Sequence, residues 1–387
     1  MSHHYLMDNQ TLISNTEVFE LQYTPETIHY RDRELRQIAG AVSPALHGAS
    51  PGNANLRGPP GTGKTTCIHR IFSELEDTTQ RVVPVFVSCD SMNTACRVFG
   101  VIFERLFGHH PPKSGIHLQQ LIAPIAKELI RRKAVLIVCL DDANNLRHNG
   151  QFDIVIRSLV RMYESYPGVK TGVLTTISDH TFSPLMILDP AVVSVWQPQE
   201  ILFSYYHHEE VHTILHDRIR MGIYPGVVSS PILDYITTLT VEGGDLRVGI
   251  DLLKHCVLNA ERDARTKVSG DDVTKAFAIA RSDHLTHLRK SLKPNEERLL
   301  SHIVEIKHDN PDIPLTSGML FASFVTIQKV SYSGFYAWLT HLNELRFIDL
   351  IQRAHIGNSR EIVLRIDEKR SPEITKNTPD KKSSRQN

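Results

Sequence analysis

The segment that most restricts the fold of this 387-residue chain is Gly58-Pro59-Pro60-Gly61-Thr62-Gly63-Lys64-Thr65, which matches the pattern G-x-x-x-x-G-K-[ST] completely. In this pattern the glycines let backbone N–H groups curl around phosphates, the lysine reaches the β- and γ-phosphates, and the hydroxyl ligates Mg²⁺. We expect a helix over Thr66–Leu75, whose positive N-terminal end faces the same anion. The motif predicts a site for the phosphates of ATP or ADP, formed by Pro60, Gly61, Thr62, Gly63, Lys64, Thr65 and Thr66.

An acidic pair at the end of an apolar segment is the expected partner of this loop. The residues Leu136-Ile137-Val138-Cys139-Leu140 read as a buried strand, and Asp141 and Asp142 follow it. In nucleoside triphosphatases with a phosphate loop, an aspartate at this place holds Mg²⁺, and a neighbouring polar residue orients the attacking water. We therefore expect Thr65 and Asp141 at the metal and Asp142 at the water.

Short apolar strands alternate with helical segments over the first half of the chain. We expect strands at residues 82–87, 134–140, 170–177 and 201–203. Strands of this kind, separated by helices, predict an α/β fold with a parallel sheet that helices cover on both faces. The strand signal ends near residue 206 and only helical periodicity remains. We predict domains at residues 1–205, 206–288 and 289–368, followed by a disordered basic tail at residues 369–387.

Residues 294 to 366 fit three helices followed by a β-hairpin, the pattern of a winged helix. We expect Asn295 to cap the first of these helices and Ser331 to begin the third. In a helix-turn-helix the second of the paired helices enters the major groove of DNA with its N-terminal residues. The expected DNA contacts are Lys329, Ser331, Tyr332, Ser333 and Tyr336 on this helix, with Arg353, His355 and Arg360 at the hairpin. The alternative is a winged helix that contacts protein.

The overall charge limits how such a chain binds nucleic acid. Lysine plus arginine and aspartate plus glutamate each number 43, so the formal net charge is zero. This excludes a globally basic DNA binder and leaves a local patch. The cysteines form no C-x-x-C pair, so we expect neither disulfides nor a structural metal site. Because no signal peptide or membrane-spanning run is evident, we expect a cytoplasmic, chromosome-associated protein without a membrane partner.

Several ordered stretches give the chain a family resemblance. They are Tyr23-Thr24-Pro25-Glu26-Thr27-Ile28-His29-Tyr30-Arg31-Asp32, Leu188-Asp189-Pro190 with Ile201-Leu202-Phe203, Tyr224-Pro225-Gly226-Val227, and Gly244-Asp245-Leu246-Arg247. With the phosphate loop, they make the chain resemble the archaeal replication initiators of the origin-recognition-complex and cell-division-cycle type. These proteins belong to the AAA+ ATPases, and the resemblance runs from about Val18 to Ile366. It implies an AAA+ sheet, a helical lid and a C-terminal winged-helix domain.

The resemblance also implies roles for particular residues. The adenine pocket would involve Tyr23, Ile28, Arg31, Tyr206 and Arg218. Arg247 would be the sensor 2 arginine, which reaches the γ-phosphate from the lid and makes lid closure depend on the nucleotide. The segment Asn93–Gly115 matches the position of an inserted helix that contacts DNA and carries Arg97 and Arg105. Its alternative is an ordinary solvated helix.

Three positions differ from the family pattern. Asp142 stands where glutamate is usual, Ser178 stands at the sensor 1 position where asparagine is usual, and Ala191 stands where arginine often follows Asp-Pro. A missing arginine finger alone can lower the rate by a factor on the order of 10³–10⁵. We therefore expect ATP binding with slow hydrolysis, carried by Asp142, Ser178 and Arg247.

The resemblance implies an initiator that binds origin duplex DNA and helps to recruit the replicative helicase, with a paralogous initiator as a second expected partner. One alternative is a transcription regulator that is built on a divergent AAA+ module. A clamp loader or helicase, which needs fast hydrolysis, fits the three altered positions less well.

Overall fold

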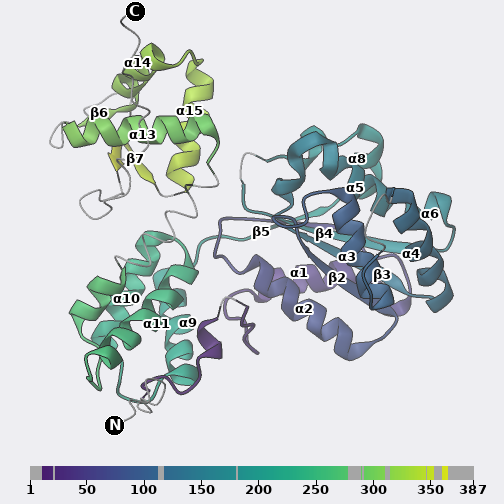
Figure 1. The fold of residues 1–387 in the computed structure, drawn as a ribbon, viewed down its shortest axis with the longest axis horizontal. Coiled ribbons are helices and arrows are strands. Elements are labelled where there is room, and N and C mark those ends of the chain that lie inside the picture. The colour runs from purple at the N-terminus through teal and green to yellow at the C-terminus, as the bar shows by residue number, and fades with distance from the viewer. Residues whose placement is uncertain are drawn as a thin grey trace, which may run out of the picture. The chain divides into compact units, whose positions relative to one another are not determined.

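The computed structural model describes residues 11–20, 22–111, 117–179, 182–277, 289, 292–309, 314–345, 347–352 and 360–364. The chain divides into two compact units (Figure 1). One unit is formed by residues 14–223 and 244–247, and the other by residues 11–13, 224–243 and the described residues from 248 onward.

The first unit contains a five-stranded parallel sheet with the strand order β2-β3-β4-β1-β5. Its strands are β1 (Ala54–Arg57), β2 (Val82–Ser88), β3 (Val135–Asp141), β4 (Lys170–Ile177) and β5 (Gln199–Leu202). Strand β3, which lies between β2 and β4, is apolar and buried from Val135 to Leu140. This burial on both faces explains why its sequence shows no alternation of polar and apolar residues.

One buried side chain connects three neighbouring strands of this sheet. Asn55 in β1 accepts a hydrogen bond from Thr175 Oγ1 in β4 at 3.0 Å. Its Nδ2 donates to Glu200 Oε1 in β5 at 2.6 Å. Both partners are the residues directly opposite Asn55 in the register of the sheet. The contacts satisfy a fully buried amide, which would otherwise carry a desolvation cost.

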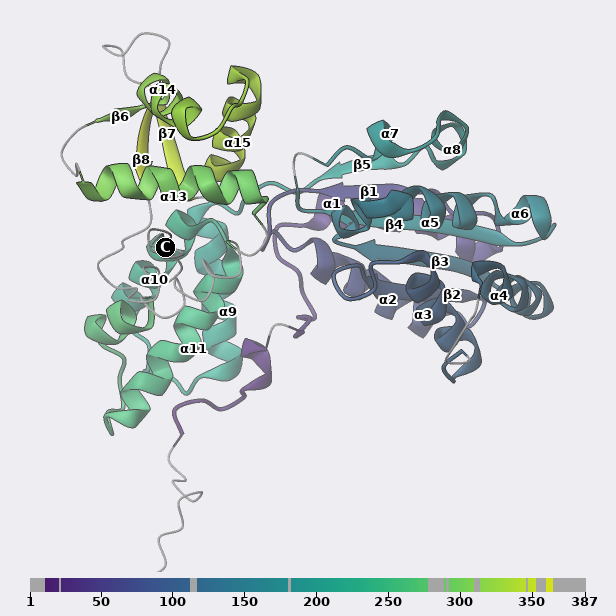
Figure 2. The same cartoon turned by 45° about the horizontal axis from the view of Figure 1, so that its top comes forward.

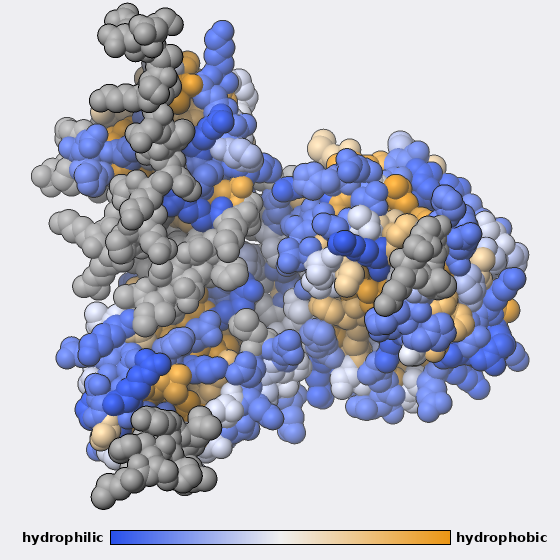
Figure 3. Space-filling model, in the orientation of Figure 1, coloured by the Kyte–Doolittle hydropathy of each residue, from blue (hydrophilic) through white to orange (hydrophobic). Residues whose placement is uncertain are grey.

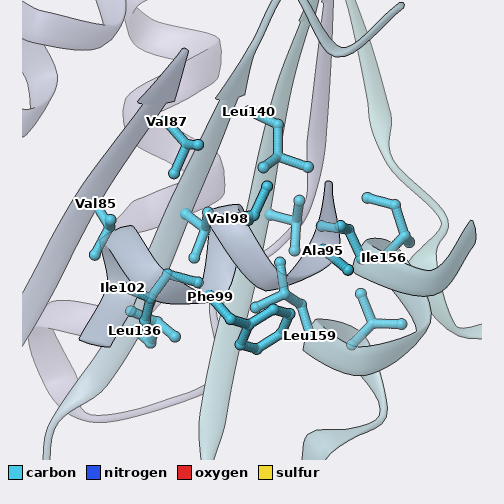
Figure 4. Packing of buried hydrophobic residues seen from close by; sticks show 14 of the residues in the cluster. Val85, Val87, Ala95, Val98, Phe99, Ile102, Leu136, Leu140, Ile156 and Leu159 are labelled. Atoms are coloured by element: carbon cyan, nitrogen blue, oxygen red, sulfur yellow. The ribbon is translucent and has the colours of Figure 1, made fainter. Parts of the chain in front are cut away.

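Helices cover both faces of the sheet (Figure 2). On one face α1 (Asp32–Val42) and α2 (Lys64–Thr78) pack against strand residues such as Leu56 and Ile137. On the other face lie α3 (Ala95–Phe107), α4 (Leu118–Arg132), α5 (Gln151–Val160) and α8 (Pro190–Trp196). Figure 4 shows Val98 and Phe99 of α3 against Leu136 and Leu140 of β3.

The remaining described elements of this unit are shorter, except for one long helix. They are the 3-10 helices η1 (Glu17–Phe19), η2 (Ser43–His47) and η3 (Ala143–Gly150), the short helices α6 (Met162–Ser165) and α7 (Pro184–Ile187), and the long helix α9 (His208–Gly222). Val18 and Phe19 of η1 are buried. Gly222 at the end of α9 lies so close to them that a Cβ there would overlap Val18 Cγ2 and come within 2.6 Å of Phe19 Cε2.

The second unit begins with helices and ends with a small antiparallel sheet. Its first helices are α10 (Ser230–Gly243), α11 (Leu246–Arg262, of which the first two residues belong to the other unit) and a helical stretch at residues 270–277. After them come α13 (Pro294–Asp309), β6 (Leu315–Thr316), α14 (Ser317–Ile327), α15 (Tyr332–Glu344), β7 (Ile348–Gln352) and β8 (Arg360–Leu364). The strand order is β6-β8-β7, and the apolar side chains of this part enclose Phe324, Phe335 and Leu339.

The predicted α/β class and parallel sheet are confirmed, as are the three C-terminal helices followed by two antiparallel strands. β1 and β6 were not predicted. The assignment of Asn295 as a cap is wrong, because it lies inside α13, where its Oδ1 accepts from Gln328 Nε2 at 3.0 Å. The backbone N–H of Lys293 instead donates to Glu296 Oε2 at 2.9 Å.

The predicted hairpin contacts Arg353 and His355 and the predicted tail at residues 369–387 lie outside the described residues. The domain boundaries after residues 205, 288 and 368 stay predictions. Over the described part of the chain, no helix is both long and apolar enough to span a bilayer. Polar residues cover most of the face drawn in Figure 3.

Candidate functional site

The glycine-rich loop connects β1 to α2 at the carboxyl edge of the sheet. Gly58 donates its N–H to Ile177 O at 3.2 Å, which ties the start of the loop to the end of β4. Gly61 and Gly63 adopt φ values of 70° and 92°, a region that residues with a Cβ rarely occupy. α2 then begins at Lys64, so its free N–H groups face the inside of the loop.

Lys64 is folded back into this loop. Its Nζ donates to Gly58 O at 2.7 Å and to Pro59 O at 2.8 Å, and the residue is only 5% exposed. Burial lowers the pKa of Lys64 to about 8, and the negative charge of Asp142 opposes that shift. Backbone carbonyls therefore hold the ammonium group, and an anion bound beside it would stabilise its charged form further.

The acidic pair lies directly beside the loop. Asp141 Oδ1 accepts hydrogen bonds from Thr65 Oγ1 at 3.0 Å and from Thr176 Oγ1 at 2.7 Å. Burial and the neighbouring charge of Asp142 raise the pKa of Asp141 above its ordinary value. A divalent cation would reverse this effect and favour the carboxylate. Hydroxyl and carboxylate oxygens are ligands that Mg²⁺ prefers, so Thr65 and Asp141 fit the predicted metal role.

Asp142 and Ser178 meet at the end of the same sheet. Ser178 Oγ donates to Asp142 Oδ1 at 2.8 Å, and the Asp142 N–H donates to Thr176 Oγ1 at 2.8 Å. Asp142 has a φ of 48°, which turns the chain sharply after β3. Thr176 links both aspartates, and no local sequence motif predicts this role. Only the register of β3 and β4 places it there, because Leu140 lies opposite Thr175.

Arg31 connects the N-terminal segment to the loop. Its Nε donates to Thr62 O at 3.0 Å and its Nη2 donates to Ser204 O at 2.7 Å. Its guanidinium carbon lies 3.9 Å from the centre of the Tyr206 ring. A Cβ on Gly63 would lie 2.9 Å from the Tyr206 hydroxyl, so this ring also touches the loop. Burial raises the pKa of Tyr206 to about 12, so its hydroxyl stays protonated.

The other residues assigned to an adenine pocket are placed differently. Arg218 of α9 is buried and donates from Nη1 to Val18 O at 2.6 Å. Its guanidinium carbon lies 4.5 Å from the centre of the Tyr23 ring. Ile28 packs against the apolar cluster that contains α1 and α2. Tyr23 and Arg218 thus contact each other, and neither has a described contact with the phosphate loop.

Arg247 is held by a neighbour in its own chain. Its Nη2 donates to Asp245 Oδ2 at 2.8 Å, and its Nε donates to Asp245 Oδ1 at 3.1 Å. Asp245 in turn lies against the phosphate loop, because a Cβ on Gly61 would overlap its carboxylate. The structure thus brings Arg247 to the phosphate loop through Asp245, a residue for which the sequence predicted no role.

The two arginines predicted to contact DNA from residues 93–115 both have partners. Arg105 of α3 forms an ion pair with Glu76 of α2, and its Nε lies 3.4 Å from Pro84 O. Arg105 and Glu76 both line a surface cavity of about 370 Å³ between α2, β2 and α3. Arg97 donates to Ser91 O at 3.2 Å. One face of α3 is buried in the apolar core.

The C-terminal residues predicted to contact DNA gather around the start of α15. Ser331 caps this helix by accepting from the Gly334 N–H at 3.2 Å, and Ser333 Oγ lies 3.2 Å from Ser331 Oγ. The rings of Tyr332 and Tyr336 stack with centroids 6.1 Å apart, and Arg360 at the start of β8 lies over Tyr336 at 5.9 Å. Lys329 precedes the helix.

The start of α9 carries two histidines with a spacing known from metal sites. Residues His208-Glu209-Glu210-Val211-His212, at the start of α9, have the spacing H-E-x-x-H, which binds zinc in some helices. The rings of His212 and His216 stack with centroids 6.5 Å apart. Among the described residues, no three His, Cys, Asp or Glu side chains form a group that could hold a metal ion.

Comparison with known proteins agrees with this geometry. Residues 27–169 match the model of an AAA ATPase domain, and residues 212–278 match that of the Cdc6 AAA+ ATPase-type lid domain. The chain is 36% identical over 362 residues to the ORC1-type DNA replication protein 2 of Methanothermobacter thermautotrophicus, covering 93% of this chain and 94% of that protein. The chain belongs to the ORC1-type DNA replication proteins.

A second relative of this ORC1-type protein supports the family assignment, and two solved structures share its fold. The ORC1-type DNA replication protein 2 of Methanosarcina mazei is 38% identical over 344 residues, covering 89% of this chain and 90% of that protein. Among solved structures, the Aeropyrum pernix ORC2 protein in its ADPNP-ADP complexes has a TM-score of 0.73 at 22% identity, covering 91% and 94% of the two chains. The Aeropyrum pernix ORC1 protein in complex with DNA has a TM-score of 0.66 at 24% identity, covering 93% and 95%.

The assigned fold is therefore an AAA+ α/β domain with a helical lid and a small C-terminal antiparallel sheet of the winged-helix type. The resemblance to archaeal initiators noted in the sequence is confirmed. The functional roles of individual residues stay predictions.

Proposed function

We propose that this ORC1-type protein is a replication initiator that binds ATP with Mg²⁺, recognises origin duplex DNA and helps to recruit the replicative helicase. The observation that carries the ATP site is the hydrogen-bonded chain Thr65–Asp141–Thr176 beside the phosphate loop. It joins the loop to the acidic strand end, as phosphate binding with a bound cation requires. The helicase and a paralogous initiator are the proposed protein partners.

In the proposed bound state, Lys64 leaves the carbonyls of Gly58 and Pro59 and faces the β- and γ-phosphates. The N–H groups of residues 61–66 would surround the phosphates, and Thr65 and Asp141 would hold Mg²⁺, which would neutralise phosphate charge. Tyr206 and Arg31, which contact the loop, are proposed to bind the nucleotide together with Ile28, Tyr23 and Arg218. The Aeropyrum pernix ORC2 complexes with ADPNP and ADP support this assignment by analogy.

Hydrolysis is proposed to be slow. Asp142 is the residue proposed to orient a water, and its Oδ1 accepts from Ser178 Oγ. Its carboxylate is one methylene shorter than that of glutamate, so it reaches less far towards a γ-phosphate. Ala191 cannot supply a positive charge in trans, and such a charge contributes a large factor to the rates of related enzymes. ATP binding rather than turnover is then the main event.

The proposed DNA surface is the start of α15 with the adjoining β8 strand. Tyr332, Ser333 and Tyr336 lie on the N-terminal turns of that helix, and Lys329 and Arg360 flank it. Such a helix places its first residues at base edges in the major groove, while basic groups beside it contact phosphates. The DNA complex of the Aeropyrum pernix ORC1 protein supports this role. Arg97 and Arg105 are a second proposed contact, which requires Arg105 to leave Glu76.

Nucleotide binding is tested with Lys64→Ala, measured by calorimetry with ATP and Mg²⁺. We expect the affinity for ATP to fall at least about a hundredfold, because a charge-assisted contact to phosphate is lost. Lys127→Ala is the matched control, since Lys127 is an exposed lysine of α4 on the same unit. Equal affinity of wild type and Lys64→Ala would overturn the assignment of the phosphate site.

The cellular role is tested by chromatin immunoprecipitation of the protein in its native genome, together with mapping of replication start points. A few sharp peaks that coincide with replication starts are the expected result. Many promoter peaks with none at replication starts would contradict the initiator role and favour a transcription regulator. Loss of helicase loading at those starts in a strain depleted of the protein would add direct support for helicase recruitment.

A further inference from the structure

Asp245 places a carboxylate directly on the phosphate loop. Its side chain is only 4% exposed, and its Cγ would lie 2.5 Å from a Cβ built on Gly61. Gly61 is part of the loop that is proposed to surround the phosphates. The Asp245 carboxylate is therefore stabilised by the same positive end of the helix and loop that would stabilise the phosphates of a nucleotide.

The same carboxylate binds the arginine that is proposed to read the nucleotide. Asp245 Oδ2 accepts from Arg247 Nη2 at 2.8 Å, and Oδ1 accepts from Arg247 Nε at 3.1 Å. The Arg247 side chain is half-exposed, with 51% of its surface accessible, so it has room to turn away from its partner. A guanidinium binds carboxylate and phosphate through the same planar arrangement of donors.

These contacts define a competition between two anions. Asp245 and Arg247 both act on the neighbouring Lys64, whose pKa is raised by the charge of Asp245 and lowered by that of Arg247. Phosphates that enter the loop meet the Asp245 carboxylate as a like charge, and Arg247 is already bound to it. Nucleotide binding therefore has to separate this pair.

We infer that Asp245 is an internal anionic competitor of the nucleotide: it holds Arg247 in the nucleotide-free chain, and the β- and γ-phosphates displace it. This inference rests on the proposed nucleotide binding. Asp245 then lowers the affinity for polyphosphates, because it competes with the phosphates for Arg247. Release of Arg247 from Asp245 becomes part of the binding step.

The test uses the full-length protein and the variant Asp245→Asn. Asp245 also occupies the cap position of α11, where its Oδ1 accepts from the Arg247 N–H at 2.9 Å. Asparagine caps helices as well as aspartate does, so this change removes the charge and keeps the cap. We expect the dissociation constant for ATP to fall about tenfold, because a nearby unit charge of like sign is removed. Binding of AMP, which lacks the β- and γ-phosphates, should change less than about twofold.

A second variant and a double variant make the result unambiguous. Asp245→Ser also keeps a capping oxygen and should tighten ATP binding in the same direction. In an Arg247→Ala background, Asp245→Asn should tighten ATP binding less than it does in the wild type, because no arginine remains to be released. Equal tightening in both backgrounds would contradict the competition for Arg247. Thermal unfolding of each variant checks that the fold is retained.

The outcomes separate this inference from the proposed function. If Lys64→Ala weakens ATP binding while Asp245→Asn and Asp245→Ser both bind ATP like the wild type or more weakly, only the competition is wrong. If the wild type binds ATP no better than Lys64→Ala, the proposed nucleotide site is wrong and the inference fails with it.

Discussion

Lys64 carries the positive charge that is proposed to bind phosphate, and its burial disfavours that same charge. Its ammonium is enclosed by the loop, and burial brings its pKa from an ordinary value of 10.5 to about 8. A protonated Lys64 therefore lowers the stability of the nucleotide-free fold below about pH 8. This loss is relieved between pH 8 and 10.5, where the unfolded chain binds the proton and the folded chain does not. In the proposed bound state, phosphate would supply the missing counter-charge.

The pH dependence of nucleotide binding follows from this pKa. Below about pH 8 Lys64 is charged and ready for phosphate, and above it the free site loses its proton. We expect the dissociation constant for ATP to rise by up to about tenfold per pH unit above pH 8. Calorimetry from pH 7 to 9.5 at constant ionic strength measures this rise. Lys64→Ala should show no such rise, and a flat profile for the wild type would refute the prediction.

At the scale of elements, the N-terminal segment and α9 form a continuous contact. Ser14 donates its N–H to Gly222 O at 2.9 Å, and Arg218 binds Val18 O near the end of the same helix. His29 lies 2.6 Å from Asp217, and Tyr30 donates to Thr213 Oγ1 at 3.1 Å. The segment that carries Arg31 is thus attached along the length of α9.

Gly222→Ala tests how tightly this contact is packed. The added methyl would overlap Val18, so we expect a loss of about 1–3 kcal/mol in the free energy of unfolding, as for other overpacked cores. Urea unfolding of the whole protein measures the loss. The control is Gly243→Ala in α10, where no atom lies within 4 Å of the new methyl. A Gly222→Ala protein as stable as the Gly243→Ala protein would contradict the close packing.

The sequence was most informative about elements with a strong pattern. The runs at residues 82–87, 134–140 and 170–177 predicted β2, β3 and β4 because apolar residues fill them. β1 was missed because its four residues include Asn55 and Arg57, and β6 because it has two residues. Thr176 and Asp245 could not be assigned functional roles from local sequence. Their contacts depend on strand register and on a loop remote in sequence, which a motif does not encode.

At the scale of the whole molecule, the balanced charge restricts the binding of DNA. Lys329 and Arg360 are the basic residues at the proposed α15 surface within the described chain, and Arg353 lies outside it. With so few cations, we expect a plot of log affinity for duplex DNA against log salt concentration to have a slope no steeper than about −4. Arg360→Ala should make that slope shallower by about 1.

Titrations of a labelled origin duplex between 50 and 300 mM salt, roughly the range in which phosphate contacts are lost, measure these slopes. Arg262→Ala is the matched control, because Arg262 is an exposed arginine at the end of α11. A slope near −10 would instead indicate a larger basic surface. An unchanged slope in Arg360→Ala would remove Arg360 from the DNA contact.

The buried amide of Asn55 has a consequence for how this sequence can evolve. It pairs with Thr175 on one side and Glu200 on the other, but only the Thr175 hydroxyl is buried, whereas Glu200 is exposed and also faces Arg57. Replacing Asn55 alone with leucine would leave the buried Thr175 hydroxyl without its acceptor, which is a costly intermediate for a lineage to pass through. We therefore expect changes at Asn55 and Thr175 to occur together, and their covariation would record, in sequence alone, that β1 and β4 are neighbours.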